Sequence, residues 1–426
     1  METREPLGRV YRPRLIDAQV EDGLETAGAV LIEGIRSCGK TMTALNAAHS
    51  YAFLDSPDSR RLAEVAPEAL LVGETPRLLD EWQLAPDLWN PVRRAVDAAD
   101  QPGRFILTGS AVPADDITRH TGAGRFLRLR EHTLAWAERP LAEVFAPVSL
   151  SRLFAGEVPA PDLGATMDYA QVIEELARPG FPGMYSLSSS RGLAMLRAYI
   201  DDVSRLDVPS LVDMRHDPIV IQQLMASLAR STASDVTFTT LAADVRAVAP
   251  GIKPETVASY VNVLERVFAV DRQKAWTPSL TSRARLRTSP KLHLADPSLA
   301  VAAMGVTARA LSGDVLVAGL VFESAVIHDL RVHTQALGGQ IRHYRDSNGH
   351  EMDAVVLLPD GTWGAVEVKL GGGQAGAGAK SLNAAVGQLD YGSSPRPSFR
   401  LIVTGTGGTY VMTDGTITCP LAALRP

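Results

Sequence analysis

The chain has 426 residues, 46% of them hydrophobic and 21% charged, and carries a net charge of -6 at pH 7. This length exceeds one compact core, so we expect roughly two to four domains. The acidic balance excludes a uniformly basic nucleic-acid binder and leaves room for a local basic patch. Only two cysteines, Cys38 and Cys419, exclude a disulfide framework. Without a signal-like apolar run or an apolar stretch of about 18 residues, we expect a cytoplasmic protein with no membrane partner.

The first third of the chain alternates short apolar runs with helical patterns. The runs that we expect to form strands are 29–34 (AVLIEG), 51–55 (YAFLD), 77–81 (RLLDE), 104–110 (RFILTGS) and 125–130 (RFLRLR). Intervening segments such as KTMTALNAAHS and LWNPVRRAVDAAD have helical patterns. This alternation predicts an α/β domain, a parallel sheet with crossover helices, over residues 1–145.

One segment in this domain predicts a nucleotide site. GIRSCGKT fits the phosphate-loop pattern G-x-x-x-x-G-K-[ST], follows an apolar strand and opens a helix. Backbone N–H groups of such a loop surround phosphates, the lysine reaches the β- and γ-phosphates, and the final hydroxyl binds Mg²⁺. The residues expected to bind ATP here are Gly34, Arg36, Ser37, Cys38, Gly39, Lys40 and Thr41.

Two later strand ends are expected to complete this site. RLLDEW places Asp80 for the magnesium shell and Glu81 to polarise the attacking water, unless the pair is an ordinary acidic strand end. Only two leucines precede this pair, which leaves hydrolysis less strongly indicated than binding. ILTGS places Thr108 and Ser110 where a hydroxyl contacts the γ-phosphate or the water, the alternative being a strand end followed by a turn.

Three arginines in GAGRFLRLR are further candidates for the nucleotide site. Arg125, Arg128 or Arg130 would act as an arginine finger, in its own subunit or in a neighbouring one. A finger supplied by a neighbour would require a homo-oligomer. The plain alternative is a solvated strand face.

The composition changes after about Pro140. APVSLSRLFAGEVPAPDLGA is rich in Pro, Gly and Ala, so we expect a linker or loose cover. With the helical pattern of Ser190–Val208 it forms a helical region over 146–215. Three helical stretches and a strand-like segment, Asp271–Asp296, then predict a winged helix over 216–305.

The predicted wing is locally basic. Between its ends it has six basic residues and no acidic one: Arg272, Lys274, Arg283, Arg285, Arg287 and Lys291. With KPETVASYVNVLERV as recognition helix, this segment would bind DNA phosphates with little sequence preference. The alternative is a lid or a protein-contact module.

The last section, 306–426, has an α/β pattern with a second candidate site in HEMDAVVLLPDGTWGAVEVKL. Asp353 and Glu367 lie on neighbouring strands, and alternation places Lys369 on the face of Glu367. Glu323, in the preceding helix, is a further expected ligand, and Glu351 is a spare acid. Carboxylates that share a divalent cation beside a lysine suit phosphodiester cleavage. An ordinary pair of strands is the alternative.

The glycine-rich segment Gly371–Ser381, GGGQAGAGAKS, follows this strand. It superficially resembles a second phosphate loop, but Ala379 precedes Lys380 where that motif needs glycine. We expect a flexible connection.

Several of these motifs together resemble one protein family. GIRSCGKT, LLDEWQLAPDLWNPVRRAVD and RFILTGSA are similar to prokaryotic AAA+-type ATP-binding proteins that carry a C-terminal domain of unknown function. The likeness continues in PGFPGMY, AYIDDVSRLDV and the FESAVIHDL, YRDSNGHEMDAVV and AVEVKL segments. It implies ATP binding with hydrolysis, a helical and winged-helix middle, and a C-terminal part like the restriction endonucleases.

Three functions remain open on this sequence. The first is an Mg²⁺-dependent ATPase that controls a winged-helix and nuclease-like half. The second is an ATPase switch whose nuclease-like domain is inert and recruits partners. The third is a DNA-binding regulator whose conformation the ATPase sets.

Overall fold

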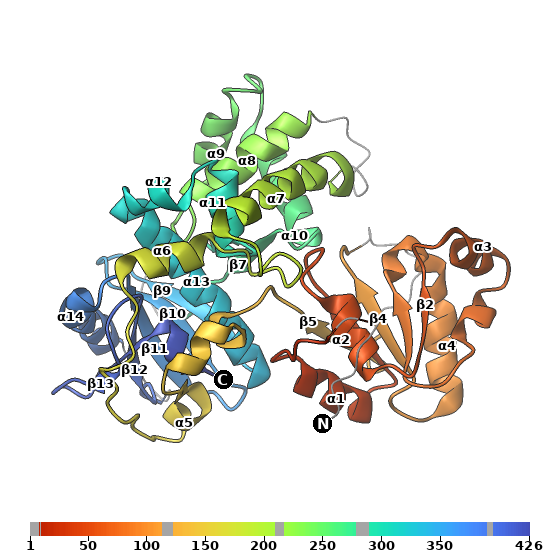
Figure 1. Ribbon diagram of the computed structural model, residues 1–426, viewed down its shortest axis with the longest axis horizontal. Coiled ribbons are helices and arrows are strands. Elements are labelled where there is room, and N and C mark those ends of the chain that lie inside the picture. Colours follow the sequence, from red (N-terminus) through yellow and green to blue (C-terminus); the bar gives the residue numbers. More distant parts are fainter. Residues whose placement is uncertain (1–7, 9, 113–121, 209–216, 278–288, 390–394) are drawn as a thin grey trace. The chain divides into compact units, whose positions relative to one another are not determined.

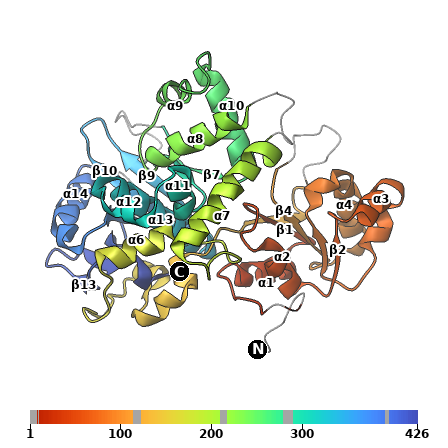
Figure 2. The ribbon, with the colours of Figure 1, turned by 45° about the horizontal axis from the view of Figure 1, so that its top comes forward.

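The computed structural model describes residues 8, 10–112, 122–208, 217–277, 289–389 and 395–426 (Figures 1 and 2). The chain divides into two compact units. The first comprises Met1–Thr133, Ser210–Asp213 and Asn262–Ala269, and the second comprises Leu134–Pro209, Met214–Val261 and Val270–Pro426. Among the described helices, none combines the length and the apolar character needed to cross a membrane.

The first unit is built on a parallel sheet with the strand order β2-β3-β4-β1-β5. Its strands are β1 (Ala29–Glu33), β2 (Ser50–Phe53), β3 (Arg77–Asp80), β4 (Phe105–Gly109) and β5 (Phe126–Arg130). Its helices are α1 (Asp17–Thr26), α2 (Lys40–Ala47), α3 (Pro57–Val65), η2 (Pro67–Leu71), η3 (Trp82–Leu84), η4 (Pro86–Leu88) and α4 (Trp89–Ala99). The expected parallel sheet with crossover helices is confirmed.

Alternation along β1 builds the core of this unit on both faces of the sheet. Ala29 and Leu31 join one cluster of buried side chains, whereas Val30 and Ile32 join another. Successive residues of a strand point to opposite faces, so an uninterrupted apolar run fits a strand buried on both sides. The buried sheet thereby fixes the loops that follow its strands.

The strand register brings the expected nucleotide residues to one edge of the sheet. Glu33, which ends β1, pairs with Gly109 of β4, and Leu79 of β3 pairs with Leu107 of β4. The segments that follow β1, β3 and β4 therefore leave the sheet at the same edge. Ligands of parallel α/β sheets bind at this carboxyl edge.

The second unit begins with short elements and a helical layer (Figure 1). They are η5 (Trp136–Glu138), η6 (Pro140–Val144), β6 (Val148–Ser149), α5 (Leu150–Phe154), α6 (Tyr169–Ala177), α7 (Ser189–Asp202) and the π-helical turn η7 (Val203–Asp207). The segment after Pro140 was expected to be a loose cover, but part of it pairs with another strand. Leu424 and Arg425 of β15 (Leu424–Arg425) pair in parallel with Val148 and Ser149.

Three helices and a two-stranded antiparallel sheet follow. They are α8 (Pro218–Arg230), α9 (Phe238–Val245), α10 (Pro254–Arg266), β7 (Val270–Gln273) and β8 (Lys291–Leu294). Their order is the one expected for a winged helix, and that assignment stays a prediction. The arginines expected at the tip of the wing, Arg283, Arg285 and Arg287, lie outside the described residues.

The C-terminal part of the second unit is a mixed sheet with the order β13-β14-β12-β11-β10-β9. Its strands are β9 (Gln340–Arg345), β10 (Glu351–Leu357), β11 (Trp363–Lys369), β12 (Arg400–Thr404), β13 (Tyr410–Val411) and β14 (Ile417–Pro420). The helical elements around it are α11 (Pro297–Ala303), α12 (Ala308–Ser312), α13 (Val315–Ala336), η9 (Gly372–Gln374), α14 (Ala375–Gly387) and η10 (Leu421–Ala423). Because β11 lies between β10 and β12, its Glu-Val-Lys end belongs to an inner strand.

The glycine-rich segment after β11 is a helix, which corrects the expectation of a flexible connection. Ala375, Ala379 and Leu382 of α14 are buried against the sheet. Gly378 faces β11 so closely that a Cβ there would lie 3.1 Å from Cγ of Lys369. The glycines weaken a helix on their own, but together with the alanines they allow α14 to lie close to the sheet.

Candidate functional site

The phosphate loop lies between β1 and α2 and is folded around Lys40. The ammonium group of Lys40 is buried and donates a hydrogen bond of 3.0 Å to the carbonyl of Ile35. Gly39, which precedes α2, has a φ of 127°, a conformation open to glycine and strained for other residues. Arg36 and Ser37 are exposed at the outside of the loop.

Close packing fixes the two ends of this loop. A Cβ at Gly34 would lie 2.2 Å from the carbonyl oxygen of Glu131, so only glycine fits. Cys38 is buried, and its Sγ lies 3.4 Å from the same oxygen. Burial raises the pKa of the Cys38 thiol, which disfavours its reactive thiolate form.

The residue pair expected to hold magnesium is in direct contact. The Thr41 hydroxyl donates to Asp80, with oxygen separations of 2.9 and 3.2 Å to the two carboxylate oxygens. The Thr108 hydroxyl donates to Oδ1 of Asp80 at 2.5 Å. Burial raises the pKa of Asp80, and the two hydroxyl hydrogen bonds oppose that rise. A hydroxyl and a carboxylate are the hard oxygen donors that Mg²⁺ prefers, so the residues fit this ion.

Glu81 is held beside Asp80 by the strand that follows. Its backbone has a φ of 57°, and its N–H donates to the Thr108 hydroxyl at 2.9 Å. The Ser110 hydroxyl donates to Oε2 of Glu81 at 2.9 Å, and the Gln83 amide donates to the same oxygen. Thr108 and Ser110, expected to contact the γ-phosphate, therefore also position the two acids.

An N-terminal brace that the sequence interpretation missed supports the phosphate loop. Buried Arg14 donates to the Cys38 carbonyl at 2.9 Å and to Glu131 at 2.8 Å. Thr43 of α2 donates to the same Glu131 oxygen at 3.1 Å. The hydroxyl of Tyr11 lies 3.3 Å from that of Thr43. No motif marks these residues, because the contacts join segments between 24 and 117 residues apart.

Arg125 is at the wrong end of its strand to bind the nucleotide of its own subunit. Its neighbour Phe126 pairs with Ala29, the first residue of β1, whereas the phosphate loop follows the last. The strand between those ends spans about 13 Å at about 3.3 Å per residue. Arg125 instead forms an ion pair with Asp97. The prediction that Arg125 binds the cofactor is therefore wrong for a contact within one subunit.

The other two arginines of this strand also have partners within the first unit. Arg128 donates to Glu33 at 2.7 Å. The guanidinium of Arg130 lies 3.9 Å from the centre of the Phe268 ring. Neither contact identifies an arginine finger.

The second candidate site gathers charged groups from β10 and β11. Asp353 lies opposite Glu367 across the two strands, next to the pair Ala354 and Val366. Lys369 donates to Glu367 at 2.7 Å, which places both side chains on one face, as alternation predicts. An irregularity in the pairing of β10 with β9 lies at Asp353, whose Oδ2 accepts the backbone N–H of Val368 at 2.8 Å. Such bulges re-aim side chains.

Two further groups complete this carboxylate–lysine cluster, which comprises Lys291, Glu323, Asp353, Glu367 and Lys369. Lys291, from β8, donates to Glu323 of α13 at 2.8 Å, and its Nζ lies 3.9 Å from Oδ1 of Asp353. Burial, and next the charge of Asp353, raises the pKa of Glu323 and of Glu367 to about 8. Burial lowers the pKa of Lys291, but the charges of Glu323 and Asp353 outweigh that effect and raise it.

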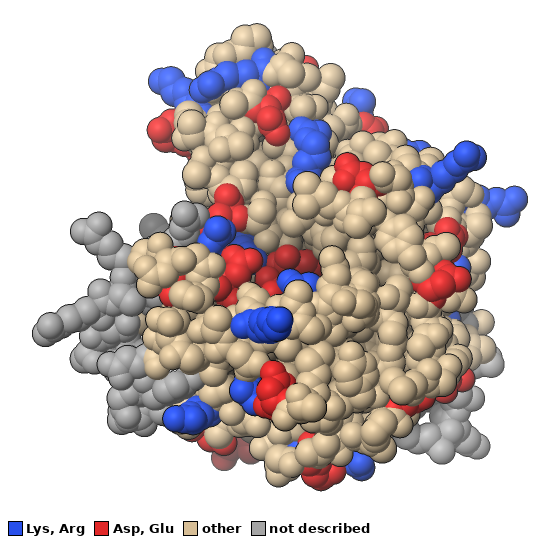
Figure 3. Space-filling view, turned by 90° about the vertical axis from the view of Figure 1, so that its left-hand side faces the viewer, with Lys and Arg blue, Asp and Glu red and all other residues tan. Residues whose placement is uncertain are grey.

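Glu367 has one unsatisfied oxygen in this cluster. The residue is 3% exposed, and its Oε2 has no hydrogen-bond partner among the residues that the structure describes. Over the described residues, no group of three or more His, Cys, Asp or Glu side chains is arranged to hold a metal ion. The donor chemistry of the three carboxylates suits a divalent cation, but Lys291 now contacts two of them. On the face that Figure 3 presents, acidic and basic side chains gather in a hollow.

Lys291 was expected to contact DNA, and the structure places it elsewhere. It is 5% exposed and paired with carboxylates, so it is not available to a DNA backbone. Of the other residues in the basic segment, Lys274 is exposed and Arg272 is partly buried in β7.

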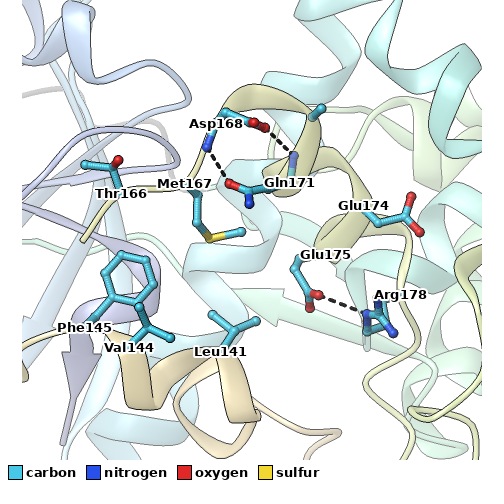
Figure 4. Close-up of a pocket in the computed structure, with 11 residues that line it drawn as sticks. Leu141, Val144, Phe145, Thr166, Met167, Asp168, Gln171, Glu174, Glu175 and Arg178 are labelled. Carbon is cyan, nitrogen blue, oxygen red and sulfur yellow. Dashed lines mark hydrogen bonds and ion pairs between the residues drawn. The ribbon is translucent and has the colours of Figure 1, made fainter. Parts of the chain in front are cut away.

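A cavity of about 610 Å³ lies elsewhere in the second unit, between η6 and α6 (Figure 4). Leu141, Phe145 and Met167 give it an apolar lining. Its acidic groups are engaged locally: Asp168 accepts the N–H of Gln171, and Glu175 pairs with Arg178. These contacts stabilise α6 and offer no catalytic group.

Comparisons with known proteins match three segments of the chain. Residues 26–139 match the family model of an AAA domain. Residues 169–310 and 318–424 match two domains of unknown function, DUF8612 and DUF4143. A search of curated proteins finds no match.

Among solved structures, the chain is similar to "the Walker-type ATPase PABY2304 of Pyrococcus abyssi". The sequence identity is 14% and the TM-score is 0.43, over 71% of this chain and 97% of that one. The AAA match covers the parallel sheet and the phosphate loop. The N-terminal part of the chain is therefore an ATPase domain of the P-loop type, a class that uses ATP with a divalent cation, generally Mg²⁺.

Proposed function

We propose that this protein hydrolyses ATP at the carboxyl edge of its parallel sheet. The observation that carries the proposal is the contact between Thr41 and Asp80, beside a Glu81 held by its neighbours. A hydroxyl from the phosphate loop and a carboxylate from β3 together suit a magnesium ion bound to phosphate oxygens. Bound there, Mg²⁺ would neutralise charge on the β- and γ-phosphates.

The side chains divide the work of this reaction. Lys40 exchanges the Ile35 carbonyl for phosphate oxygens when ATP binds, since its ammonium group lies within the loop. Glu81 accepts a hydrogen bond from the attacking water and orients it toward the γ-phosphate. Thr108 and Ser110 hold Asp80 and Glu81 in register, so both acids are positioned before ATP arrives.

An ATPase assay with Lys40→Ala tests the proposal. Loss of the ammonium group should abolish ATP binding or turnover, because Lys40 is the cation buried inside the loop, whereas Arg36 lies exposed at its outside. Lys253→Ala removes an exposed lysine of the second unit and should keep the wild-type rate. Full turnover by Lys40→Ala would overturn the nucleotide site.

For the second unit, we propose metal-dependent phosphodiester cleavage at the carboxylate–lysine cluster. The supporting observation is the unsatisfied, buried Oε2 of Glu367 next to Asp353 and Lys369. Asp353, Glu367 and Glu323 would hold the ion, and Lys369 would orient water or phosphate. A bound divalent cation would supply Lewis-acid activation of the phosphodiester.

Cleavage assays with Mg²⁺ or Mn²⁺, ATP and varied DNA and RNA test this second function. Asp353→Ala and Lys369→Ala should each lose cleavage. Asp360→Ala, in the exposed turn between the same strands, is the matched control and should cleave normally. If wild type leaves every substrate intact, the cluster is inert, and the regulatory ATPase switch becomes the better proposal.

Two wider proposals concern coupling and partners. ATP state would control the second unit, and the basic segment around β7 and β8 would bind DNA. Salt-sensitive DNA binding that is lost on neutralising Arg283, Arg285 and Arg287 tests the DNA contact. Sedimentation with and without ATP tests whether a homo-oligomer completes the nucleotide site.

A further inference from the structure

Lys291 reaches the carboxylate–lysine cluster from a different part of the chain than the acids it contacts. It lies on β8, before α13, and contacts Glu323 of α13 and Asp353 of β10. These two acids are among the ligands proposed above for a divalent cation. The inference below rests on that proposed metal-dependent function.

The strand pair that carries Lys291 is anchored at this site. Gln273 of β7 lies opposite Lys291 and donates to the backbone carbonyl of Asp353 at 2.7 Å. His293 lies two residues beyond Lys291, and its Nδ1 lies 3.2 Å from the Ser324 hydroxyl, next to Glu323. Lys291 is therefore held among the acids by its strand and does not merely fold back from the surface.

The ammonium group occupies one side of these carboxylate oxygens, and its positive charge opposes a metal ion placed beside it. Its Nζ lies 2.8 Å from Oε1 of Glu323, while Mg²⁺ requires oxygen ligands at about 2.0–2.1 Å in a nearly octahedral shell. Two cations this close repel each other, so the ammonium group weakens metal binding at these carboxylates. The other lysine differs: Lys369 is 28% exposed at its side chain and pairs with Glu367 alone.

Ion pairs that only stabilise the fold would not account for every charged group of the carboxylate–lysine cluster. Three carboxylates face two ammonium groups, and Oε2 of Glu367 is buried without a partner. Buried acceptors without partners are costly, and carboxylates that share a site repel one another. One added cation would satisfy both deficits, provided that Lys291 gives up its place.

We propose that Lys291 and a divalent cation compete for Glu323 and Asp353, so that this site binds its metal only when the Lys291 ammonium withdraws. Lys291 is then an internal occupant that keeps the site metal-free. The withdrawal breaks the Lys291–Glu323 ion pair, one of the contacts between β8 and α13, so metal loading would loosen the attachment of β8 to this helix.

Calorimetric titration of the full-length, nucleotide-free protein with Mn²⁺ tests this competition. Lys291→Met keeps the aliphatic length and removes the charge, and it should bind Mn²⁺ at least about tenfold more tightly than wild type. Lys253→Met removes an exposed lysine and should match wild type. Adding Asp353→Asn to Lys291→Met should abolish the gained affinity, which separates this site from Asp80.

A second measurement uses the wild-type chain, in case Lys291→Met does not fold. Lys291 should react slowly with an amine-directed acylating reagent without metal, and several-fold faster with saturating Mn²⁺, by peptide mass spectrometry. Exposed Lys253 should react equally in both conditions.

The outcomes separate the two proposals. If wild type and Lys291→Met bind Mn²⁺ equally tightly at a site that depends on Asp353, the proposed competition is wrong and the proposed metal site stands. No Asp353-dependent binding in either protein would overturn both. Unchanged labelling of Lys291 at saturating Mn²⁺ would also contradict the competition.

Discussion

The two candidate sites are built in opposite ways. The nucleotide site consists largely of one continuous loop and the ends of two adjacent strands, and its acids are held by neutral hydroxyl groups. The carboxylate–lysine cluster takes its groups from β8, α13, β10 and β11, and these charges hold one another. An empty phosphate loop costs little free energy, because its backbone groups need no charged partner. Buried charged side chains are costly unless they are paired, so without a ligand they pair with one another.

The largest effect that we expect tests whether Glu81 acts in chemistry and not in binding. Glu81→Gln keeps the side-chain shape and removes the charged acceptor for water, so the kcat for ATP should fall by about 100-fold or more. ATP affinity should stay within about threefold of wild type. Phosphate release and binding of a fluorescent ATP analogue measure the two quantities, with Glu74→Gln as an exposed control. A large loss of affinity would instead make Glu81 part of the binding loop.

The Arg14 brace tests how far the nucleotide site also depends on charges from distant segments. Arg14→Met leaves Glu131 buried without its cation and should lower the free energy of unfolding of the first unit by about 3–5 kcal/mol. Glu131→Gln in the same chain should restore part of that loss. Denaturant unfolding measures this change in the free energy of unfolding. Hydrogen exchange of residues 29–47 then reports the change locally, at the phosphate loop. A loss below about 1 kcal/mol would leave the loop independent of the brace.

A histidine in α13, the helix that carries Glu323, tests the cost of buried ionisable groups in the second unit. Burial lowers the pKa of His333 to about 4, and both ring nitrogens lack hydrogen-bond partners. The folded state therefore takes up the proton less readily than the unfolded state, whose pKa is about 6.5. The neutral, buried His333 therefore makes its full contribution to stability above pH 6.5. This contribution is lost as the pH falls toward 4, because proton uptake favours the unfolded state.

His333→Leu should reduce this acid sensitivity. The difference in unfolding free energy between pH 7.5 and pH 5 should shrink by about 2 kcal/mol, since each pKa unit corresponds to about 1.4 kcal/mol. Urea unfolding of the second unit at both pH values measures it. Exposed His49 in the first unit is the control. An unchanged difference would mean that His333 is protonated or solvated in the folded chain.

The smallest effect concerns Arg125. Because it lies at the far end of β5 and forms a half-exposed ion pair, Arg125→Ala should change ATP turnover less than about twofold in dilute protein. Steady-state assays over a range of protein concentrations check this. A large loss that appears only at high concentration would restore the arginine finger, as a residue acting on a neighbouring subunit.

Sequence patterns located residues correctly where their position depends on neighbours in the chain. The phosphate loop, the acids at the end of β3 and the hydroxyls after β4 follow strands whose apolar runs are plain in the sequence. The Glu367–Lys369 face was also predictable, because strand alternation is a local rule.

Sequence patterns failed where a role depends on distant partners. Lys291 was grouped with the arginines of the basic segment because its sequence neighbours are basic, yet its partner Glu323 lies 32 residues further along. Gly371–Ser381 was expected to be flexible from its composition, but the sheet beneath α14 favours small side chains. Arg14 offered no signal, since its side-chain partners Cys38 and Glu131 come from distant segments.

The pairing of β15 with β6 has a consequence for the order in which the chain is assembled. Val148 and Ser149 of β6 pair with Leu424 and Arg425 of β15. Strand β6 therefore obtains its partner strand only after some 275 further residues have been synthesised. Domains generally fold as the chain emerges, N-terminal parts first. The ATPase sheet can thus form early, while the Ala142 carbonyl lacks the hydrogen bond from Arg425 until that residue has been synthesised. Ribosome-bound chains arrested before residue 424 would carry a completed nucleotide fold and an unfinished second unit.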